Sequence, residues 1–253
     1  MDVIVLAGAK NDGALRAVSE SPYEAGISVG GRSLLDYVVD SLRKVRAIER
    51  MVVVGPLESL SPDLRTAVWR IVPPGGQMVE NLRRGLAALA ARDKVLVATA
   101  DIPLITPEAI EDFLARCRER EADVYYPIVE RGPLEARFPG AKRTYATLRE
   151  GTFTGGNLIL LAPEIVERHQ AMIELAVALR KKPFQMARLL GLVCLLKLLL
   201  GRLSISEIED RVEKGLHFKG AAVITPYAEI GIDVDKPSDL ALVRKVLSAP
   251  AAT

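Results

Sequence analysis

The sequence predicts an α/β fold in which a mostly parallel sheet is covered by helices on both faces. Runs rich in Val and Ile alternate with helical patterns along the chain, which is the order of elements in such folds. The strand runs are continuously apolar, as is typical of strands buried on both faces. Glycines or carboxylates follow three strand runs, in the segments 3–8, 95–103 and 231–240. Ligands bind at that edge of open α/β sheets.

The elements can be assigned in chain order. Apolar runs predict strands at Asp2–Leu6, Met51–Val54, Trp69–Val72, Lys94–Thr99, Asp123–Ile128 and Asn157–Leu161. Helical patterns predict helices at Ser33–Val45, Gln77–Ala91, Pro107–Arg120 and Pro237–Leu247. The third helix has a well-marked start, because Thr106 offers a capping hydroxyl, Pro107 suits the first helical position and Glu108 places an acid in the first turn.

Residues 163–216 interrupt this alternation and predict two or three helices without a strand between them. We therefore expect one domain, residues 1–253, with a helical insertion at about 163–216. The middle of this stretch, Phe184–Leu203, holds 14 apolar residues and three cations, Arg188, Lys197 and Arg202. Its uncharged runs are shorter than the roughly 18 residues of a spanning helix. We expect a helix packed within the insertion or in a homodimer interface; contact with an anionic membrane surface is the alternative.

Composition excludes several classes of protein. The net charge of +2 gives no electrostatic argument for a nucleic-acid partner. Two cysteines without a CxxC pair, together with two histidines, argue against a disulfide scaffold and a structural zinc site. The N-terminus lacks a basic region before its apolar run, so it reads as a strand and not as a signal peptide. The expected location is cytoplasmic, with a peripheral membrane contact through Phe184–Leu203 as the alternative.

The loop after the first predicted strand is the first candidate ligand site. It follows Leu6 and Ala7, and small or polar residues there let backbone N–H groups surround a phosphate: Gly8, Ala9, Asn11, Asp12 and Gly13. Lys10 and Arg16 add positive charge. An ordinary turn is the alternative. The loop matches neither GxGxxG nor GxxxxGK[ST], which disfavours dinucleotide-fold oxidoreductases and P-loop ATPases.

Asp101 stands at the end of an apolar strand, where a carboxylate is costly unless it meets a cation or hydrogen-bond donors. It is a candidate Mg²⁺ ligand, and an Asx-type turn is the alternative. Asp233 and Asp235 alternate along a predicted last short strand, so we expect them to face opposite sides and only one to join Asp101. Asp235 is preferred because it stands at the end of that strand. Solvation of a strand end would explain the pair equally well.

Two Gly-Gly turns are further candidate binding elements. The first precedes a helix whose Gln77 and Asn81 offer amide groups suited to the edge of a nucleobase. A flexible loop beside a solvated helix face is the alternative. The second turn consists of Gly155 and Gly156 and leads into Asn157. It can shape an acceptor pocket or form a tight bend.

Several segments together resemble the MobA-like nucleotidyltransferases, a group that includes molybdenum-cofactor guanylyltransferases and cytidylyltransferases acting on sugars or isoprenoid precursors. The resembling segments are LAG at the first strand end, GGRSLLDYVVDSL (30–42), ATADIPLIT (98–106), TFTGGNLILL (152–161) and IDVDKPSDL (232–240). They span most of the chain outside residues 163–216. The resemblance implies a Rossmann-like GT-A domain that transfers a nucleoside monophosphate from an NTP to a phosphorylated acceptor and releases pyrophosphate.

The resemblance also implies roles for individual residues. The first loop would hold the triphosphate, and Asp101 and Asp235 would hold Mg²⁺. Gln77 and Asn81 would lie near the base, and residues 155–157 near the acceptor. The implied partners are GTP or CTP and a phosphorylated small molecule. No general base is needed, because a phosphate oxygen is already a nucleophile near neutral pH, so the chemistry is positioning and charge neutralisation.

The chain departs from the family pattern in the first loop, which reads LAGAKNDGALR where the family has LAGG followed by Gly and Arg. The family also has a lysine shortly before the GGR turn, where this chain has Glu24. Losing one preorganised donor typically costs about 10²–10³ in rate. Arg16, Lys10 or Arg32 would have to substitute for that lysine.

Two alternatives to this function remain. A GT-A glycosyltransferase would have Asp-x-Asp at the strand end, whereas this chain has Thr99-Ala100-Asp101. A non-catalytic nucleotide-binding or membrane-docking relative is favoured by Glu24 and by the apolar 184–203 segment. Pyrophosphate release from NTPs separates an enzyme from such a module.

Overall fold

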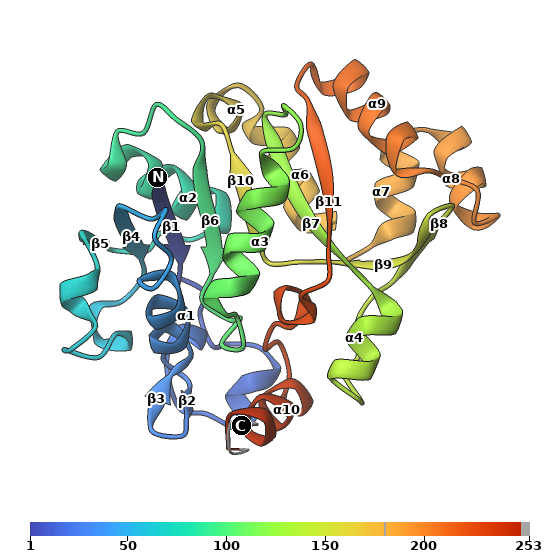
Figure 1. The fold of residues 1–253 in the computed structure, drawn as a ribbon. Helices are drawn as coiled ribbons and strands as arrows, with labels where there is room; N and C mark the ends of the chain where they lie inside the picture. Colours follow the sequence, from blue (N-terminus) through green and yellow to red (C-terminus); the bar gives the residue numbers. More distant parts are fainter. Residues whose placement is uncertain (180, 249–253) are drawn as a thin grey trace.

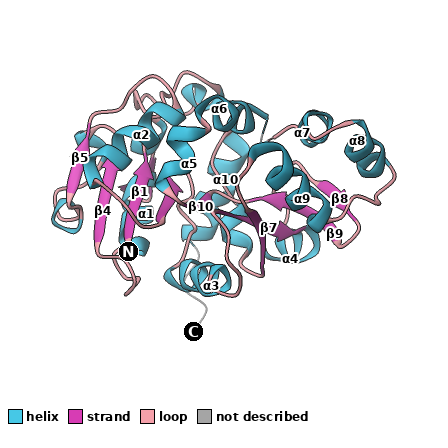
Figure 2. Cartoon of the chain, turned by 90° about the horizontal axis from the view of Figure 1, so that it is seen from above, coloured by secondary structure: helices cyan, strands magenta, loops and turns pink. Residues whose placement is uncertain are grey.

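The structure of the protein, a computed structural model, describes residues 1–179 and 181–248. Within these residues, nine strands form one mixed sheet (Figure 1). Their spatial order is β5 (Arg70–Val72), β4 (Arg50–Val54), β1 (Asp2–Leu6), β6 (Val95–Thr99), β10 (Leu158–Leu161), β7 (Val124–Glu130), β9 (Gly151–Gly155) and β8 (Ala146–Leu148), with β11 (Gly220–Thr225) also paired to β7. The two ends of this arrangement, β5 and β8, lie at opposite ends of the molecule in Figures 1 and 2.

The half of the sheet from β5 to β6 is parallel, as the sequence predicts. β1 pairs in parallel with β4 on one side and with β6 on the other, which confirms residues 2–6 as an internal strand. The other half is mixed. β10 runs antiparallel to both β6 and β7, while β11 runs parallel to β7. The sequence did not predict β8, β9 or β11.

Helices cover both faces of the sheet, because alternate residues of each central strand point to opposite sides. On β1, Val3 and Val5 pack with α1 (Leu34–Leu42) and α3 (Pro107–Cys117), and α10 (Pro237–Ser248) adds to the same layer. Ile4 packs with α2 (Met78–Leu89) on the other face. Figure 2 shows α2 and α6 above the sheet and α3 below it. The continuously apolar strands are thus buried on both sides.

The hairpin of β2 (Ser28–Val29) and β3 (Arg32–Ser33) leads into α1. Gly30 and Gly31 form its turn with φ of 57° and 81°, a left-handed conformation that glycine adopts without strain. Ser33 then caps α1 through a reciprocal pair of hydrogen bonds with Asp36.

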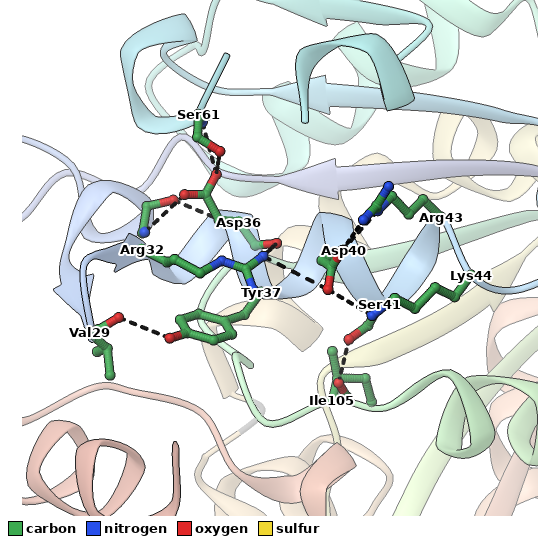
Figure 3. A network of polar contacts seen from close by, with 11 residues as sticks. Val29, Arg32, Asp36, Tyr37, Asp40, Ser41, Arg43, Lys44, Ser61 and Ile105 are labelled. Carbon is green, nitrogen blue, oxygen red and sulfur yellow. Dashed lines mark hydrogen bonds and ion pairs between the residues drawn. The ribbon is translucent and has the colours of Figure 1, made fainter. Parts of the chain in front are cut away.

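Polar contacts tie α1 to the loops around it (Figure 3). Asp36 Oδ1 accepts hydrogen bonds from both the backbone N–H and the hydroxyl of Ser61, each at 2.9 Å. Ser41 Oγ donates to the backbone carbonyl of Ile105 at 2.7 Å. Ile105 belongs to the loop that follows β6, so α1 fixes the segment that carries the first candidate carboxylate, Asp101.

The described residues of 163–216 form five helices: α5 (Pro163–Arg168), α6 (Gln170–Leu179), α7 (Pro183–Leu189), α8 (Leu192–Leu199) and α9 (Ile205–Leu216). The expectation of two or three helices, with one of them spanning 184–203, is wrong. Gly191 lies between α7 and α8 with a φ of 118°, which breaks the helix. Upstream, the loop after β7 forms another helix that was not predicted, α4 (Arg131–Arg137).

One face of α8 remains exposed although its other face is packed. Cys194 and Leu198 form a small cluster with Ala187 and Leu203. Leu192 and Leu199, in contrast, are 71% and 61% exposed. The insertion therefore covers only part of its own apolar surface. No helix among the described residues combines the length and apolar character needed to cross a membrane.

Candidate functional site

Three carboxylates meet at the carboxyl edge of the sheet. β6 ends at Thr99, two residues before Asp101, and the Asp101 carbonyl accepts a hydrogen bond from the Val234 N–H at 2.9 Å. This bond joins the two segments that carry the acids. One carboxylate oxygen from each of Asp101, Asp233 and Asp235 lies within 4.8 Å of the other two. The structure therefore brings together the three acids that the sequence singled out.

The expectation that only one of Asp233 and Asp235 would join Asp101 is wrong. It assumed a strand through these residues, with side chains alternating between faces. In the structure, residues 232–236 are irregular and lie between β11 and α10. Freed from strand geometry, both side chains turn toward Asp101.

Asp101 is held in an environment that disfavours its charge. Its Oδ1 accepts a hydrogen bond from the Thr99 hydroxyl. Burial of the carboxyl group, and then the negative charge of Asp233, raise the pKa of Asp101 to about 6. A cation placed among these acids would relieve that penalty.

Asp233 is the acid whose charge the protein itself balances. Arg143 Nη1 donates to Asp233 Oδ1, and Arg143 Nη2 donates to the Asp233 backbone carbonyl at 2.7 Å. The two side chains are only 7% and 6% exposed. Lys181 Nζ donates to the other oxygen, Asp233 Oδ2, at 3.0 Å. Both oxygens of Asp233 are therefore engaged, which leaves Asp101 and Asp235 as the candidate direct metal ligands.

Lys181 also contacts Asp235, so one ammonium group bridges two of the three acids. It lies between α6 and α7, within the helical segment. Sequence reasoning found neither Lys181 nor Arg143. They lie 52 and 90 residues before Asp233, in segments without a recognisable motif, so no sequence signal pointed to them.

The first loop lies next to the carboxylates. It begins at Leu6, whose carbonyl accepts a hydrogen bond from the Ala100 N–H at 3.0 Å. Asn11 is buried, and its amide nitrogen donates to the carbonyls of Ser19 and Ser21 at 3.0 and 2.9 Å. Asn11 therefore shapes the loop and has no amide proton left for a ligand.

Lys10 and Arg16, the two cations predicted for this loop, are both exposed. Arg16 Nη1 donates to the Glu20 carbonyl at 2.8 Å. Glu24, at the position where the family has a lysine, donates its backbone N–H to the Ala9 carbonyl at 3.0 Å. Burial raises the pKa of Glu24, as do the charges of Asp12 and Asp233, while Lys181 lowers it. Glu24 therefore faces the same space as the carboxylate cluster.

Asn81 connects the first loop to the first Gly-Gly turn. Its side-chain oxygen accepts a hydrogen bond from the Gly75 N–H at 2.6 Å. A Cβ atom on Gly8 would lie 2.6 Å from Asn81 Nδ2, so only glycine fits beside it. Asn81 thus positions two loops from a buried site. Gln77 is exposed at the N-terminus of α2 and makes no capping hydrogen bond there.

The second Gly-Gly turn is packed closely against its neighbours. A Cβ on Gly155 would lie 2.1 Å from the Tyr126 hydroxyl, and one on Gly156 would lie 2.5 Å from Ile230 Cγ2. Asn157 accepts a backbone hydrogen bond from Thr99 at 3.3 Å. The glycines therefore have a packing role, and Asn157 stands beside the end of β6, next to the carboxylates.

The residues at this edge fit a Mg²⁺ ion. The ion takes oxygen ligands and is typically held by one or two carboxylates together with phosphate oxygens. The cluster offers oxygen donors only, from Asp101, Asp233 and Asp235. Burial and the charge of Asp233 raise the pKa of Asp101, and a bound cation would favour its ionised form.

The structure thus has a mostly parallel sheet with an acidic cluster and a glycine-containing first loop at its carboxyl edge, the arrangement that the resemblance to nucleotidyltransferases implies. The chain belongs to the MobA-like NTP transferase domain family, which it matches over residues 4–184.

Solved structures show the same fold. A hypothetical transferase from Thermus thermophilus is 42% identical, with a TM-score of 0.80 over 94% of this chain and 98% of that one. A CMP:2-keto-3-deoxy-manno-octonic acid synthetase complexed with CTP has a TM-score of 0.58 at 16% identity, and each chain is 98% covered. A 4-diphosphocytidyl-2C-methyl-D-erythritol synthase gives 0.58 at 18% identity with the same coverage.

Curated relatives match over shorter stretches. A phosphoenolpyruvate guanylyltransferase from Sphaerobacter thermophilus is 33% identical over 91 residues, which is 35% of this chain and 44% of the relative. The bifunctional protein GlmU of Azorhizobium caulinodans is 35% identical over 96 residues, which is 34% of this chain and 21% of the relative. The chain thus spans less than half the length of these relatives.

Proposed function

We propose that this protein is a Mg²⁺-dependent nucleotidyltransferase that moves a nucleoside monophosphate from an NTP to a phosphorylated small-molecule acceptor. The observation that carries this proposal is the cluster of Asp101, Asp233 and Asp235 beside the first loop, at the carboxyl edge of the sheet. The family supports the reaction class, and the cluster supports its metal dependence.

The side chains of the site have two roles: some would bind the metal ion, and others hold the metal-binding segments in place. Asp101 and Asp235 would hold Mg²⁺, which when bound supplies positive charge to phosphate oxygens. Asp233 is fixed by Arg143 and holds the second acid segment in place. The first loop, residues 8–13, would take the triphosphate through its backbone N–H groups.

The reaction balances without a general base. An acceptor phosphate oxygen forms a bond to the α-phosphorus of the NTP, and the bond from that phosphorus to the bridging oxygen breaks. The electron pair leaves with pyrophosphate. Holding two polyanions in line is the main requirement. We propose that Gln77, which directly precedes α2, lies near the base. We also propose that residues 155–157 lie near the acceptor.

The nucleotide is proposed to be GTP or CTP. A guanylyltransferase is among the curated relatives, and a structure with CTP is among the solved neighbours. A thermal shift assay with ATP, GTP, CTP and UTP, each with Mg²⁺, tests this choice. A ligand that binds only the folded protein raises the melting temperature by mass action, so one or two NTPs should stand out. Equal shifts with all four would contradict base recognition.

Catalysis is tested by pyrophosphate release in an acceptor screen with Asp101→Asn. The variant should fold like the wild type and lose at least about 10²-fold in rate, as expected when a preorganised electrostatic group is removed. Asp93→Asn is the matched control, because Asp93 is exposed at the opposite end of β6. Unchanged turnover in Asp101→Asn would refute the role of that residue.

A second candidate role, membrane docking, is favoured by the exposed face of α8. We propose an anionic lipid surface as its partner, because the exposed Arg188 and Arg202 flank the exposed Leu192 and Leu196 and each cation contributes about 1 kcal/mol near such a surface. Co-sedimentation with phosphatidylserine vesicles should be reduced in the Leu192→Gln/Leu196→Gln variant and by salt. A homodimer that dissociates in this variant, detected by light scattering, would instead assign the face to a second subunit.

A further inference from the structure

Lys181 is the side chain from the helical segment that forms ion pairs with the carboxylate cluster, as far as the described residues show. Its Nζ lies 3.0 Å from Asp233 Oδ2 and also donates to Asp235 Oδ2. Lys182, the next residue, is exposed and forms no ion pair among the described residues. The contact is therefore specific to one of two adjacent lysines.

Glu24 is a further acid close to the carboxylate cluster. Glu24 faces Asp12, Asp233 and Lys181 closely enough for each charge to affect its pKa. Four acids thus share this space: Glu24, Asp101, Asp233 and Asp235. A triphosphate adds further negative charge, so its binding requires positive side chains as well as a metal ion.

Only two cations contact these acids in the described residues, and they differ in how firmly they are held. The Arg143 side chain is 7% exposed and donates to both the side chain and the backbone of Asp233. It is committed to a structural pair. The Lys181 side chain is 46% exposed and stands on the short connection between α6 and α7. A flexible, half-exposed ammonium can change partners, whereas a buried guanidinium cannot.

Building on the proposed function, we propose that Lys181 is the phosphate-binding cation of the site. In this role Lys181 leaves Asp235 to the Mg²⁺ ion and donates to the phosphate oxygens that depart as pyrophosphate. The helical segment thereby contributes a side chain to the nucleotide site. Lys181 thus links nucleotide binding to the position of α6 and α7.

The proposal predicts opposite effects on nucleotide and metal binding in Lys181→Met. Loss of one charge-assisted contact should weaken Mg·GTP or Mg·CTP about 10- to 100-fold in isothermal titration. The affinity for Mn²⁺ alone should be unchanged or higher, because the ammonium no longer competes for Asp235. Mn²⁺ binding is monitored by the decrease of the paramagnetic resonance signal of free Mn²⁺. Lys181→Arg should recover most of the nucleotide affinity, and Lys182→Met should match the wild type.

Three outcomes would overturn the proposal. Nucleotide affinity in Lys181→Met equal to that in Lys182→Met would show that Lys181 does not bind phosphate. Parallel loss of Mn²⁺ binding, nucleotide binding and melting temperature would assign Lys181 a structural role only. If the wild type binds none of the four NTPs with Mg²⁺, the proposed function fails, and this inference fails with it. Wild-type nucleotide binding combined with an unaffected Lys181→Met variant would refute this inference alone.

Discussion

Arg143 and Asp233, 90 residues apart in the chain, form a buried ion pair in which the guanidinium also donates to the Asp233 carbonyl at 2.7 Å. The pair fixes the segment between β11 and α10, on which Asp235 also stands. It therefore determines where two of the three clustered acids lie.

Arg143→Met should lower the free energy of unfolding by about 3 kcal/mol, because it leaves a buried carboxylate with one partner fewer. Equilibrium unfolding in urea measures the loss. Asp233→Asn in the same chain should restore part of it, since the charge that needed the partner is gone. Arg149→Met is the control, because the Arg149 side chain is 69% exposed and surface pairs contribute about 0–1 kcal/mol. Equal effects of the two arginine variants would contradict a structural role for Arg143.

Cys117 should resist thiol reagents in the folded protein. Burial raises the pKa of its thiol to about 12, so at pH values near an ordinary cysteine pKa of about 8.5 it keeps its proton and supplies almost no reactive thiolate. A Cys194→Ser variant isolates Cys117, and its labelling by a disulfide reagent is compared in buffer and in urea. Labelling as fast in buffer as in urea would show that Cys117 is accessible.

Two glycine-to-alanine substitutions in helices should have opposite signs. A Cβ on Gly85 of α2 would lie 2.7 Å from Ile4 Cγ2 on β1, whereas a Cβ on Gly215 of α9 meets nothing within 4 Å. Alanine is favoured over glycine in helices by about 1 kcal/mol, so Gly215→Ala should raise the melting temperature. Gly85→Ala should lower it, because overpacking costs about 1–3 kcal/mol. Stabilisation by both substitutions would mean that α2 and β1 are not in close contact.

Much of the fold could be predicted because local pattern decides it. Residues 3–6 and 95–98 are continuous apolar runs within their strands. Thr106 and Pro107 mark the start of α3. β11 could not be predicted in the same way. Its residues GAAVIT are mostly small, and the strand exists because it pairs with β7, whose residues lie about a hundred positions earlier. Long-range pairing of this kind leaves little trace in a local sequence window.

The candidate site likewise contains residues that local sequence could point to and residues that it could not. Asp101 could be singled out because it closely follows the apolar run of β6. Asp235 was singled out from a strand that the structure does not contain. The position of Asp233 relative to Asp101 could not be predicted, because the segment that carries Asp233 is irregular and side chains do not alternate between faces there. Lys181 could not be found because its approach to Asp235 depends on how α6 and α7 pack, a property of the whole fold.

The central claim is that Asp101 and Asp235 hold a divalent cation together with a nucleotide. The most direct test is a titration of the protein with Mn²⁺ in the presence of GTP and, separately, of CTP. Binding is monitored by the decrease of the paramagnetic resonance signal of free Mn²⁺. The account predicts one tight Mn²⁺ per chain with at least one of the two nucleotides, lost in Asp101→Asn and in Asp235→Asn and retained in Asp93→Asn. Binding that persists unchanged in both site variants, or no binding to the wild type with either nucleotide, would contradict it.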